Sequence, residues 1–258
     1  MTASTLDRTR DRLLEVGHRI FSLVPAWVGG HAHRLPTRLT FGITGPFNGQ
    51  RQRQAAVRAM FRAVPFARII ETGTYRALTT MYLRQISDAP IGTVEVNPTY
   101  FEYSKRRLES LPAVHQYLGH SPVVLERLRG DALWQQTPCF FYLDAHWLND
   151  LPLVDELHVV RQGWPDFAAL IDDFRVDGDD GYFYDDYGDG KTLALPLLSA
   201  VAELADLRVF WPAAASTRET GARRGWVVVA SVGSVADALA QLPELRDGGR
   251  VGGQRGAS

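Results

Sequence analysis

The chain has 258 residues, of which 45% are hydrophobic, and its formal net charge at pH 7 is -1. This length and apolar content suffice for one α/β domain with a full core and extensions, and the near-zero charge argues against a general nucleic-acid binder, which would carry a basic face. No apolar run is long enough for a membrane span, no signal-peptide core is found, and the single cysteine, Cys139, cannot form an intramolecular disulfide. We therefore expect a cytoplasmic protein that contacts neither a membrane nor nucleic acid.

Residues 1–64 are expected to form an N-terminal helical extension and cap. Apolar residues within 2–23 recur at the spacing of an amphipathic helix, and a second helix is predicted at 50–64, where Pro65 ends it. The sequence leaves open whether the apolar face of the first helix covers the sheet or a second copy in a homodimer.

The first predicted strand, residues 67–72, is rich in β-branched side chains and is followed by Gly73 and a helix-compatible segment at 77–86. A second buried strand begins at Gly92, and it ends at the acidic residue Glu95. This order is typical of the first half of a nucleotide-binding α/β sheet, in which a turn approaches the ligand and a carboxylate about twenty residues later accepts hydrogen bonds from two ribose hydroxyls.

The turn itself argues against a dinucleotide. A pyrophosphate needs the pattern G-x-G-x-x-G, but Tyr75 and Leu78 stand where the second and third glycines would fall. Glu71 also places a negative charge beside the turn, which would repel phosphate. S-adenosylmethionine, which has a ribose and a positive charge but no phosphate, fits these residues better.

The turn Glu71-Thr72-Gly73 resembles the acidic-x-Gly turn of the class I S-adenosylmethionine-dependent methyltransferases, although Tyr75 and Ala77 replace their later glycines. In that family the residues after the third strand touch the adenine, which gives this role to His120 and Ser121. An ordinary turn with a helix cap at Ser121 explains the same residues. The cofactor-binding residues that the resemblance implies are Glu71, Thr72, Gly73, Thr74, Tyr75, Glu95, Val96, Asn97, His120, Ser121 and Asp144.

The remaining pattern alternates helices and strands. Strands are predicted at 114–118, 139–143, 167–171, 207–211 and 225–231, and helices at 98–111, 122–130, 151–160, 192–204 and 235–242. We predict a Rossmann-like, doubly wound α/β sheet of seven strands, mostly parallel with one antiparallel strand near the C-terminus, and helices on both faces. Residues 65–243 form the methyltransferase domain in this interpretation, and 244–258 a disordered tail.

Acidic side chains stand at the carboxyl ends of four predicted strands, where open α/β sheets bind ligands. They are Glu71, Glu95, Asp144 and Asp172. The Asp-, Gly- and Tyr-rich segment 177–190 follows the fifth strand, and it is either a substrate-binding lid or a solvated acidic loop.

The segments Tyr142-Leu-Asp-Ala-His-Trp147 and Ile171-Asp-Asp-Phe174 resemble the metal-dependent, catechol-type O-methyltransferases and their antibiotic-tailoring relatives. The resemblance implies a magnesium ion held by Asp144, Asp172 and Asp173. Leu148 replaces the lysine base of the catechol enzymes, so the predicted catalytic residues are His146, with Lys191 in reserve, and Asp144, since an aspartate would serve as base if no ion binds.

We therefore expect an S-adenosylmethionine-dependent methyltransferase that methylates a hydroxyl of a small molecule by in-line displacement. The abundance of arginine, alanine and glycine suggests a GC-rich bacterial source, and the resemblance suggests secondary metabolism. Two alternatives stay open: a cofactor-binding scaffold that no longer methylates, and a nicotinamide-dependent oxidoreductase on a similar sheet.

Overall fold

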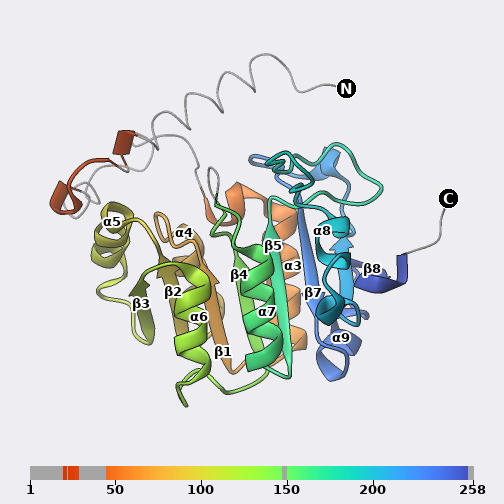
Figure 1. Cartoon of the computed structure of the whole chain (residues 1–258), viewed down its shortest axis with the longest axis horizontal. Helices are drawn as coiled ribbons and strands as arrows, with labels where there is room; N and C mark the ends of the chain where they lie inside the picture. The colour runs from red at the N-terminus through yellow and green to blue at the C-terminus, as the bar shows by residue number, and fades with distance from the viewer. Residues whose placement is uncertain (1–19, 22, 29–44, 147–149, 255–258) are drawn as a thin grey trace.

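A computed structural model describes residues 20–21, 23–28, 45–146 and 150–254 of the chain. Most of the helix predicted at 2–23 lies outside these residues, as do Trp147 and Leu148. Within the described part, a single sheet runs through the molecule with helices on both sides (Figure 1).

The described residues form an eight-stranded sheet with the order β3-β2-β1-β4-β5-β7-β6-β8. Strands β1 to β5 are mutually parallel, and β7 pairs antiparallel with both β5 and β6, as β8 does with β6. The strands are β1 (Arg68–Thr72), β2 (Ile91–Glu95), β3 (Val114–Leu118), β4 (Cys139–Leu143), β5 (Phe167–Asp172), β6 (Arg208–Pro212), β7 (Trp226–Ala230) and β8 (Leu245–Arg250).

The helices divide between the two faces of the sheet (Figure 1). The side chains of α6, α7 and α8 belong to one core cluster, and those of α3, α4 and α9 to the other. The described α-helices are α3 (Arg51–Ala63), α4 (Leu78–Ile86), α5 (Pro98–Leu108), α6 (Ser121–Arg129), α7 (Leu153–Gly163), α8 (Leu195–Ser199) and α9 (Ser234–Leu239). No helix among the described residues is long and apolar enough to cross a membrane.

Strand β4 shows why the apolar runs form central strands. Successive side chains of a strand point to opposite faces, and Cys139, Phe141 and Leu143 pack in one core cluster while Phe140 and Tyr142 pack in the other. Because helices cover both faces, every residue of the strand is buried.

The predicted sheet needs one correction, because the described residues contain eight strands and two of them, β7 and β8, run against the others. The additional strand β8 lies in the segment expected to be a disordered tail. Its sequence, Leu-Arg-Asp-Gly-Gly-Arg, lacks the apolar alternation of a strand, since only Leu245 is buried. A register shift opposite Arg208 and Phe210, together with a positive φ of 80° at Gly249, indicates a β-bulge in this edge strand.

The helix predicted at 192–204 is also shorter than expected. Helix α8 ends at Ser199, and Val201 adopts an extended conformation before a 3-10 turn at Ala202–Leu204. The acidic segment before α8 is joined to the residues preceding β7 by an isolated bridge between Phe183 and Arg224, and a second bridge, between Asp186 and Thr192, closes a turn within the loop.

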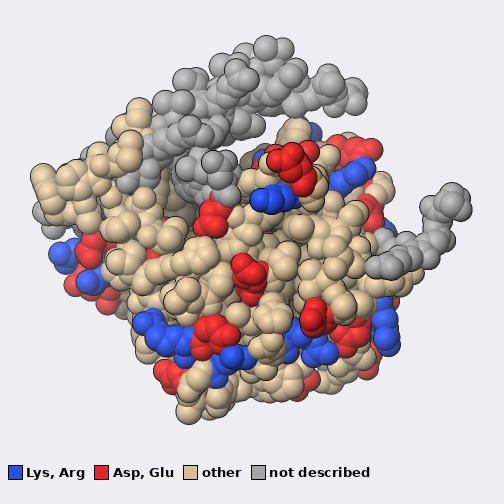
Figure 2. Space-filling model, in the orientation of Figure 1, with Lys and Arg blue, Asp and Glu red and all other residues tan. Residues whose placement is uncertain are grey.

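The strand order fixes where a ligand site can lie. Strands β1 and β4 are neighbours although β2 and β3 come between them in sequence, so the chain reverses its direction of winding at this point. Open α/β sheets bind ligands in the crevice beyond the carboxyl ends of the strands at such a switch point. This edge is uppermost in Figure 1, and acidic and basic side chains are interspersed on the face shown in Figure 2.

Candidate functional site at the carboxyl ends of the strands

The turn after β1 packs directly against the end of β4. Gly73 has a φ of 84°, and a Cβ atom at this position would lie 2.2 Å from the carbonyl oxygen of Asp144. The amides of Gly73 and Thr74 donate to the carbonyl oxygen of Val94 at 2.9 and 3.0 Å. Only glycine permits this approach, and the turn is thereby fixed beside both β2 and β4.

Glu71 lies beneath this turn and faces into the protein. Its Oε2 atom accepts hydrogen bonds from the hydroxyls of Thr80 at 2.5 Å and Thr93 at 2.7 Å. Burial raises the pKa of Glu71 to about 7, although both hydrogen bonds lower it. Glu71, which was expected from the sequence to repel phosphate, therefore holds the turn through hydrogen bonds inside the protein.

Glu95 joins the first turn to the second. Its side chain is almost buried, with 6% of the residue exposed. The Oε2 atom accepts the amide of Tyr75 at 2.7 Å, and Oε1 accepts the amide of Asn97 at 2.8 Å. Burial raises the pKa of Glu95, while the amides of Asn97, Tyr75 and Val96 lower it. An ionised carboxylate offers about four acceptor positions, so Glu95 retains capacity for a further donor.

The residues around Glu95 take different positions. Asn97 caps α5 by accepting the amides of Thr99 and Tyr100 at 2.9 and 3.2 Å. Val96 is 56% exposed at the end of β2. The ring of Tyr75, the residue that replaces the second glycine of the expected motif, contacts that of Tyr100 with centroids 4.7 Å apart.

The N-terminal residues lie against this part of the site, beside α5 (Figure 1). The hydroxyl of Thr99 donates to the carbonyl oxygen of Val24 at 2.6 Å. The ring of Phe21 lies 5.2 Å from that of Tyr100. The described part of the N-terminal extension thus covers the helix that follows Glu95.

His120 and Ser121, which follow β3, differ in their exposure to solvent. His120 is exposed, and its Nε2 atom lies 3.2 Å from Oδ2 of Asp150. Ser121 is buried as the first residue of α6, while the cap position is His120, which makes no side-chain cap hydrogen bond. The interpretation of Ser121 as a helix cap is therefore wrong.

Three functional side chains converge after β4 and β5. They are Asp144, His146 and Asp173, each with one potential ligand atom within 4.8 Å of the others. The Nε2 atom of His146 lies 3.9 Å from Oδ1 of Asp144 and 3.7 Å from Oδ2 of Asp173. Its side chain is only 1% exposed, and Nε2 has no hydrogen-bond partner among the residues the structure describes. Both separations exceed an ordinary hydrogen bond, but they lie within the range of an ion pair when the imidazole is protonated.

The three groups perturb one another's protonation. Burial raises the pKa of Asp144 well above its usual range, and the charges of Asp172 and Asp173 add to this effect. Burial alone would lower the pKa of His146, but Asp173 and Asp144 raise it to about 9. Burial likewise opposes ionisation of Asp173, but Arg224 and His146 hold its pKa well below its usual range. The two carboxylates thus favour the protonated form of His146, which is the form that cannot accept a proton.

Asp172, predicted as a metal ligand, lies outside this cluster. Its fully buried carboxylate pairs with the guanidinium of Arg53, with 2.6 Å between Nη1 and Oδ1. Its Oδ2 atom accepts the hydroxyl of Tyr142 at 2.5 Å and the amide of Asn48 at 3.1 Å. Asp173 has a φ of 54°, and this left-handed turn directs the two adjacent carboxylates to different partners.

Two further residues belong to the cluster's surroundings. Arg224 binds Asp173 through Nε and Asp185 through Nη2. Arg224 precedes β7, and neither hydrophobic periodicity nor a motif connects it with Asp173 in the sequence. Lys191, the predicted reserve base, is exposed, and its amide donates to Gly188 in the turn closed by the bridge between Asp186 and Thr192.

The sequence matches no model of a known protein family, and it matches none of the curated proteins compared with it. Solved structures do share the fold. An O-methyltransferase from Bacillus cereus in complex with SAH is 13% identical, with a TM-score of 0.51 over 86% of this chain and 99% of that chain. The O-methyltransferase TomG from Streptomyces achromogenes, involved in tomaymycin synthesis and solved in complex with SAM, is 15% identical, with a TM-score of 0.47 over 90% of this chain and 92% of that chain.

The chain thus has an α/β fold that it shares with a solved methyltransferase structure. Among solved structures, the O-methyltransferase from Bacillus cereus has this fold over nearly its whole length. The resemblance identified from Glu71-Thr72-Gly73 is therefore confirmed for the fold.

Proposed function

We propose that this protein is an S-adenosylmethionine-dependent methyltransferase that transfers a methyl group to a hydroxyl of a small molecule. The observation that carries the proposal is the position of Glu95. This carboxylate stands at the end of β2, beside the Gly73 turn and the switch point, and it retains capacity for a further donor. A ribose hydroxyl would supply that donor.

The neighbouring residues fit the rest of the cofactor. The exposed side chain of Val96 would contact the adenine from the end of β2. Gly73 brings the β1 turn within contact of Asp144, and a sulfonium bound beside this turn would be attracted by the carboxylates of the cluster.

The donor set of the cluster fits a divalent cation, because the buried Nε2 atom of His146 has no partner in the described residues and faces Asp144 and Asp173. These three residues would hold the ion. Asp172 is not included, since Arg53, Tyr142 and Asn48 already bind its oxygens. Imidazole with carboxylates suits Mn²⁺, Fe²⁺ or Zn²⁺ better than Mg²⁺. When bound, the ion would lower the pKa of the acceptor hydroxyl.

The chain's own residues supply alignment. Transfer forms the bond between oxygen and methyl carbon and breaks the bond between that carbon and sulfur, so acceptor oxygen, methyl and sulfur must lie in line. Glu95 would hold the ribose, and Asp144 would orient the acceptor beside the Gly73 turn. Arg224 fixes Asp173 through the ion pair described above. His146 serves as a ligand in this proposal rather than as the base, because its unpaired Nε2 atom faces both carboxylates, and a bound cation would displace the proton that these carboxylates favour.

Calorimetry with S-adenosylhomocysteine tests the cofactor assignment. We expect the wild-type protein to bind it and to ignore NADH, and we expect Glu95→Ala to weaken binding at least about tenfold, or 1.4 kcal/mol. Glu102→Ala, on the surface of α5, is the matched control and should bind as wild type. Binding of NADH alone would favour the oxidoreductase, and binding of S-adenosylhomocysteine without turnover of any hydroxylated acceptor would favour the scaffold.

Mn²⁺ titration followed by electron paramagnetic resonance tests the cation site independently of activity. His146→Gln and Asp173→Asn should each weaken Mn²⁺ binding at least about tenfold. Asp172→Asn should bind Mn²⁺ as wild type while losing thermal stability. Equal loss in Asp172→Asn and Asp173→Asn, with folded spectra for both, would instead restore the predicted magnesium set.

A further inference from the structure

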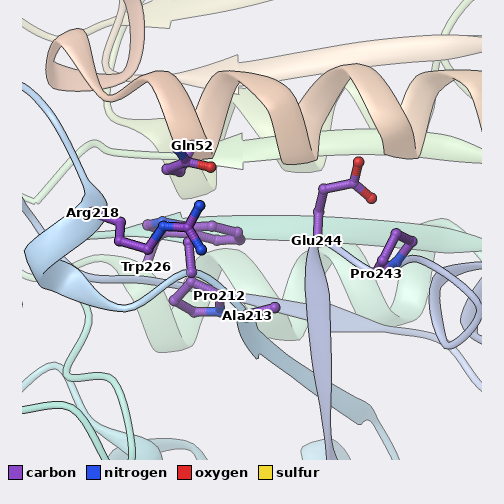
Figure 3. A pocket seen from close by; sticks show the side chains of 8 residues that line it. Gln52, Pro212, Ala213, Arg218, Trp226, Pro243 and Glu244 are labelled. Atoms are coloured by element: carbon purple, nitrogen blue, oxygen red, sulfur yellow. The ribbon is translucent and has the colours of Figure 1, made fainter.

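A partly open cavity lies on the α3 face of the sheet (Figure 3). Its volume is about 200 Å³. It is bordered by the start of α3, the end of β6, the start of β7 and the turn that precedes β8, and none of its lining residues belongs to the cluster of Asp144, His146 and Asp173. The residues that line it are Gln52, Pro212, Ala213, Ala214, Arg218, Trp226, Pro243 and Glu244.

Two buried polar atoms of this lining have no partner among the described residues. Trp226 is only 1% exposed, and its indole Nε1 makes no hydrogen bond. The Oε2 atom of Glu244 is likewise buried and unpaired. Leaving a buried donor and a buried acceptor unpaired is unfavourable, so both atoms point to a polar occupant of the cavity.

The charged side chains that line the cavity limit the kind of molecule that could bind there. Arg218 and Glu244 line the same cavity with opposite charges, yet within the described part of the chain neither forms an ion pair with the other or with a third residue. Figure 3 shows Arg218 and Trp226 on one side of the cavity and Glu244 on the other. A molecule with a negative and a positive end would join these two sides, with the exposed Arg218 at the rim of the cavity.

The size of the cavity limits that molecule. A volume of 200 Å³ corresponds to about six water molecules, and it lies below the roughly 300 Å³ at which pockets for drug-sized ligands begin. The walls formed by Pro212, Ala214 and Pro243 are apolar. The space therefore suits a compact molecule with a short aliphatic part.

We propose that this cavity binds a small zwitterion of the α-amino acid class. Arg218 and the indole N–H of Trp226 receive its carboxylate, and Glu244 receives its ammonium group. The site is distinct from the proposed cofactor site, but Trp226 lies opposite Asp172 in the register of β5 and β7. The guanidinium of Arg53 lies 5.9 Å from the Trp226 ring, so the cavity lies next to the buried ion pair of Arg53 and Asp172.

Ligand-observed NMR of the full chain with four probes tests the ligand class. L-alanine and L-proline carry both charges, propionate carries only the carboxylate, and propylamine carries only the ammonium. We expect the amino acids to bind in the millimolar range or tighter, and propionate and propylamine at least about tenfold more weakly. Absence of amino-acid binding up to about 10 mM, or equal binding of propionate, would overturn the proposal.

Four variants locate the binding. Trp226→Phe keeps the ring and removes the donor, and should weaken L-proline binding about three- to tenfold. Arg218→Met and Glu244→Gln should each weaken it at least about tenfold. Arg246→Met is the matched control, because this arginine binds the carbonyl oxygen of Asp177 outside the cavity, and it should bind as wild type.

All four variants should retain binding of S-adenosylhomocysteine if the wild type has it, which keeps this test separate from that of the proposed function. L-proline binding that survives all three cavity substitutions would show that the cavity is not the site.

Discussion

Replacing Arg53 by methionine should be among the most destabilising single changes in this protein. The guanidinium and the carboxylate of Asp172 are both fully buried and 2.6 Å apart. Arg53 also donates to the carbonyl oxygen of Arg224 at 2.8 Å. In Arg53→Met the carboxylate would keep only hydrogen bonds such as those from Tyr142 and Asn48. Removing one partner of a buried ion pair costs about 3–5 kcal/mol, which for a domain of this size lowers the melting temperature by roughly 10 °C.

Urea unfolding followed by circular dichroism measures this free energy. Arg62→Met is the matched control, because Arg62 is exposed in the last turn of the same helix and its loss should change stability by no more than about 0.5 kcal/mol. The double variant Arg53→Met/Asp172→Asn should be more stable than Arg53→Met, since it removes the unpaired charge. A loss below about 1 kcal/mol in Arg53→Met, or no recovery in the double variant, would refute the reasoning.

Three further changes have defined outcomes. Gly73→Ala should lower the unfolding free energy by about 1–3 kcal/mol and abolish binding of S-adenosylhomocysteine, because the added Cβ would lie 2.2 Å from the carbonyl oxygen of Asp144. A variant that unfolds at the wild-type temperature and binds S-adenosylhomocysteine would contradict this prediction. The pKa of Glu71 is raised from 4.5 to about 7, so the protonated carboxyl stabilises the fold at low pH, and about 3 kcal/mol of the unfolding free energy is lost as the pH rises through 7. Glu71→Gln should lack this loss in denaturation curves measured between about pH 4 and pH 8. An unchanged pH dependence in this variant would count against the prediction. Tyr142→Phe removes the hydroxyl that donates to Asp172 and should lower the unfolding free energy by about 1–3 kcal/mol, whereas a neutral result would mean that this hydrogen bond contributes nothing.

The central sheet could be predicted because the hydrophobic residues of its strands are the residues that the fold buries. Cys139–Leu143 has the predicted bounds, since an unbroken apolar run between turn residues is typical of a strand covered on both faces. Strand β8 could not be found in this way, because it is an edge strand held by backbone pairing with β6 and most of its side chains are exposed.

The site was predictable in position but not in its pairings. The ends of β1, β2, β4 and β5 were located from acidic residues at strand ends, and Asp144 and Asp173 do lie together. The sequence cannot show that Asp172 pairs with Arg53, which is 119 positions away, since no pattern connects the two. It also cannot show the left-handed backbone at Asp173, a conformation uncommon outside glycine.

The two amides that bind Glu95 illustrate the same limit. The sequence indicates an acid at the end of β2, and the expected partner was a ribose. The fold adds the amides of Tyr75 and Asn97, which come from two separate turns. Backbone donors carry no residue-specific signal, so their position depends on the tertiary structure alone.

The bulged strand β8 has a practical consequence for handling the protein. It occupies the free hydrogen-bonding side of β6, whose Val209, Phe210 and Trp211 are fully buried. A form shortened to end at residue 243 would bare that side of β6, and an unpaired apolar strand is a template for intermolecular pairing. Such a form should aggregate on purification, and an affinity tag at this end should therefore follow residue 258.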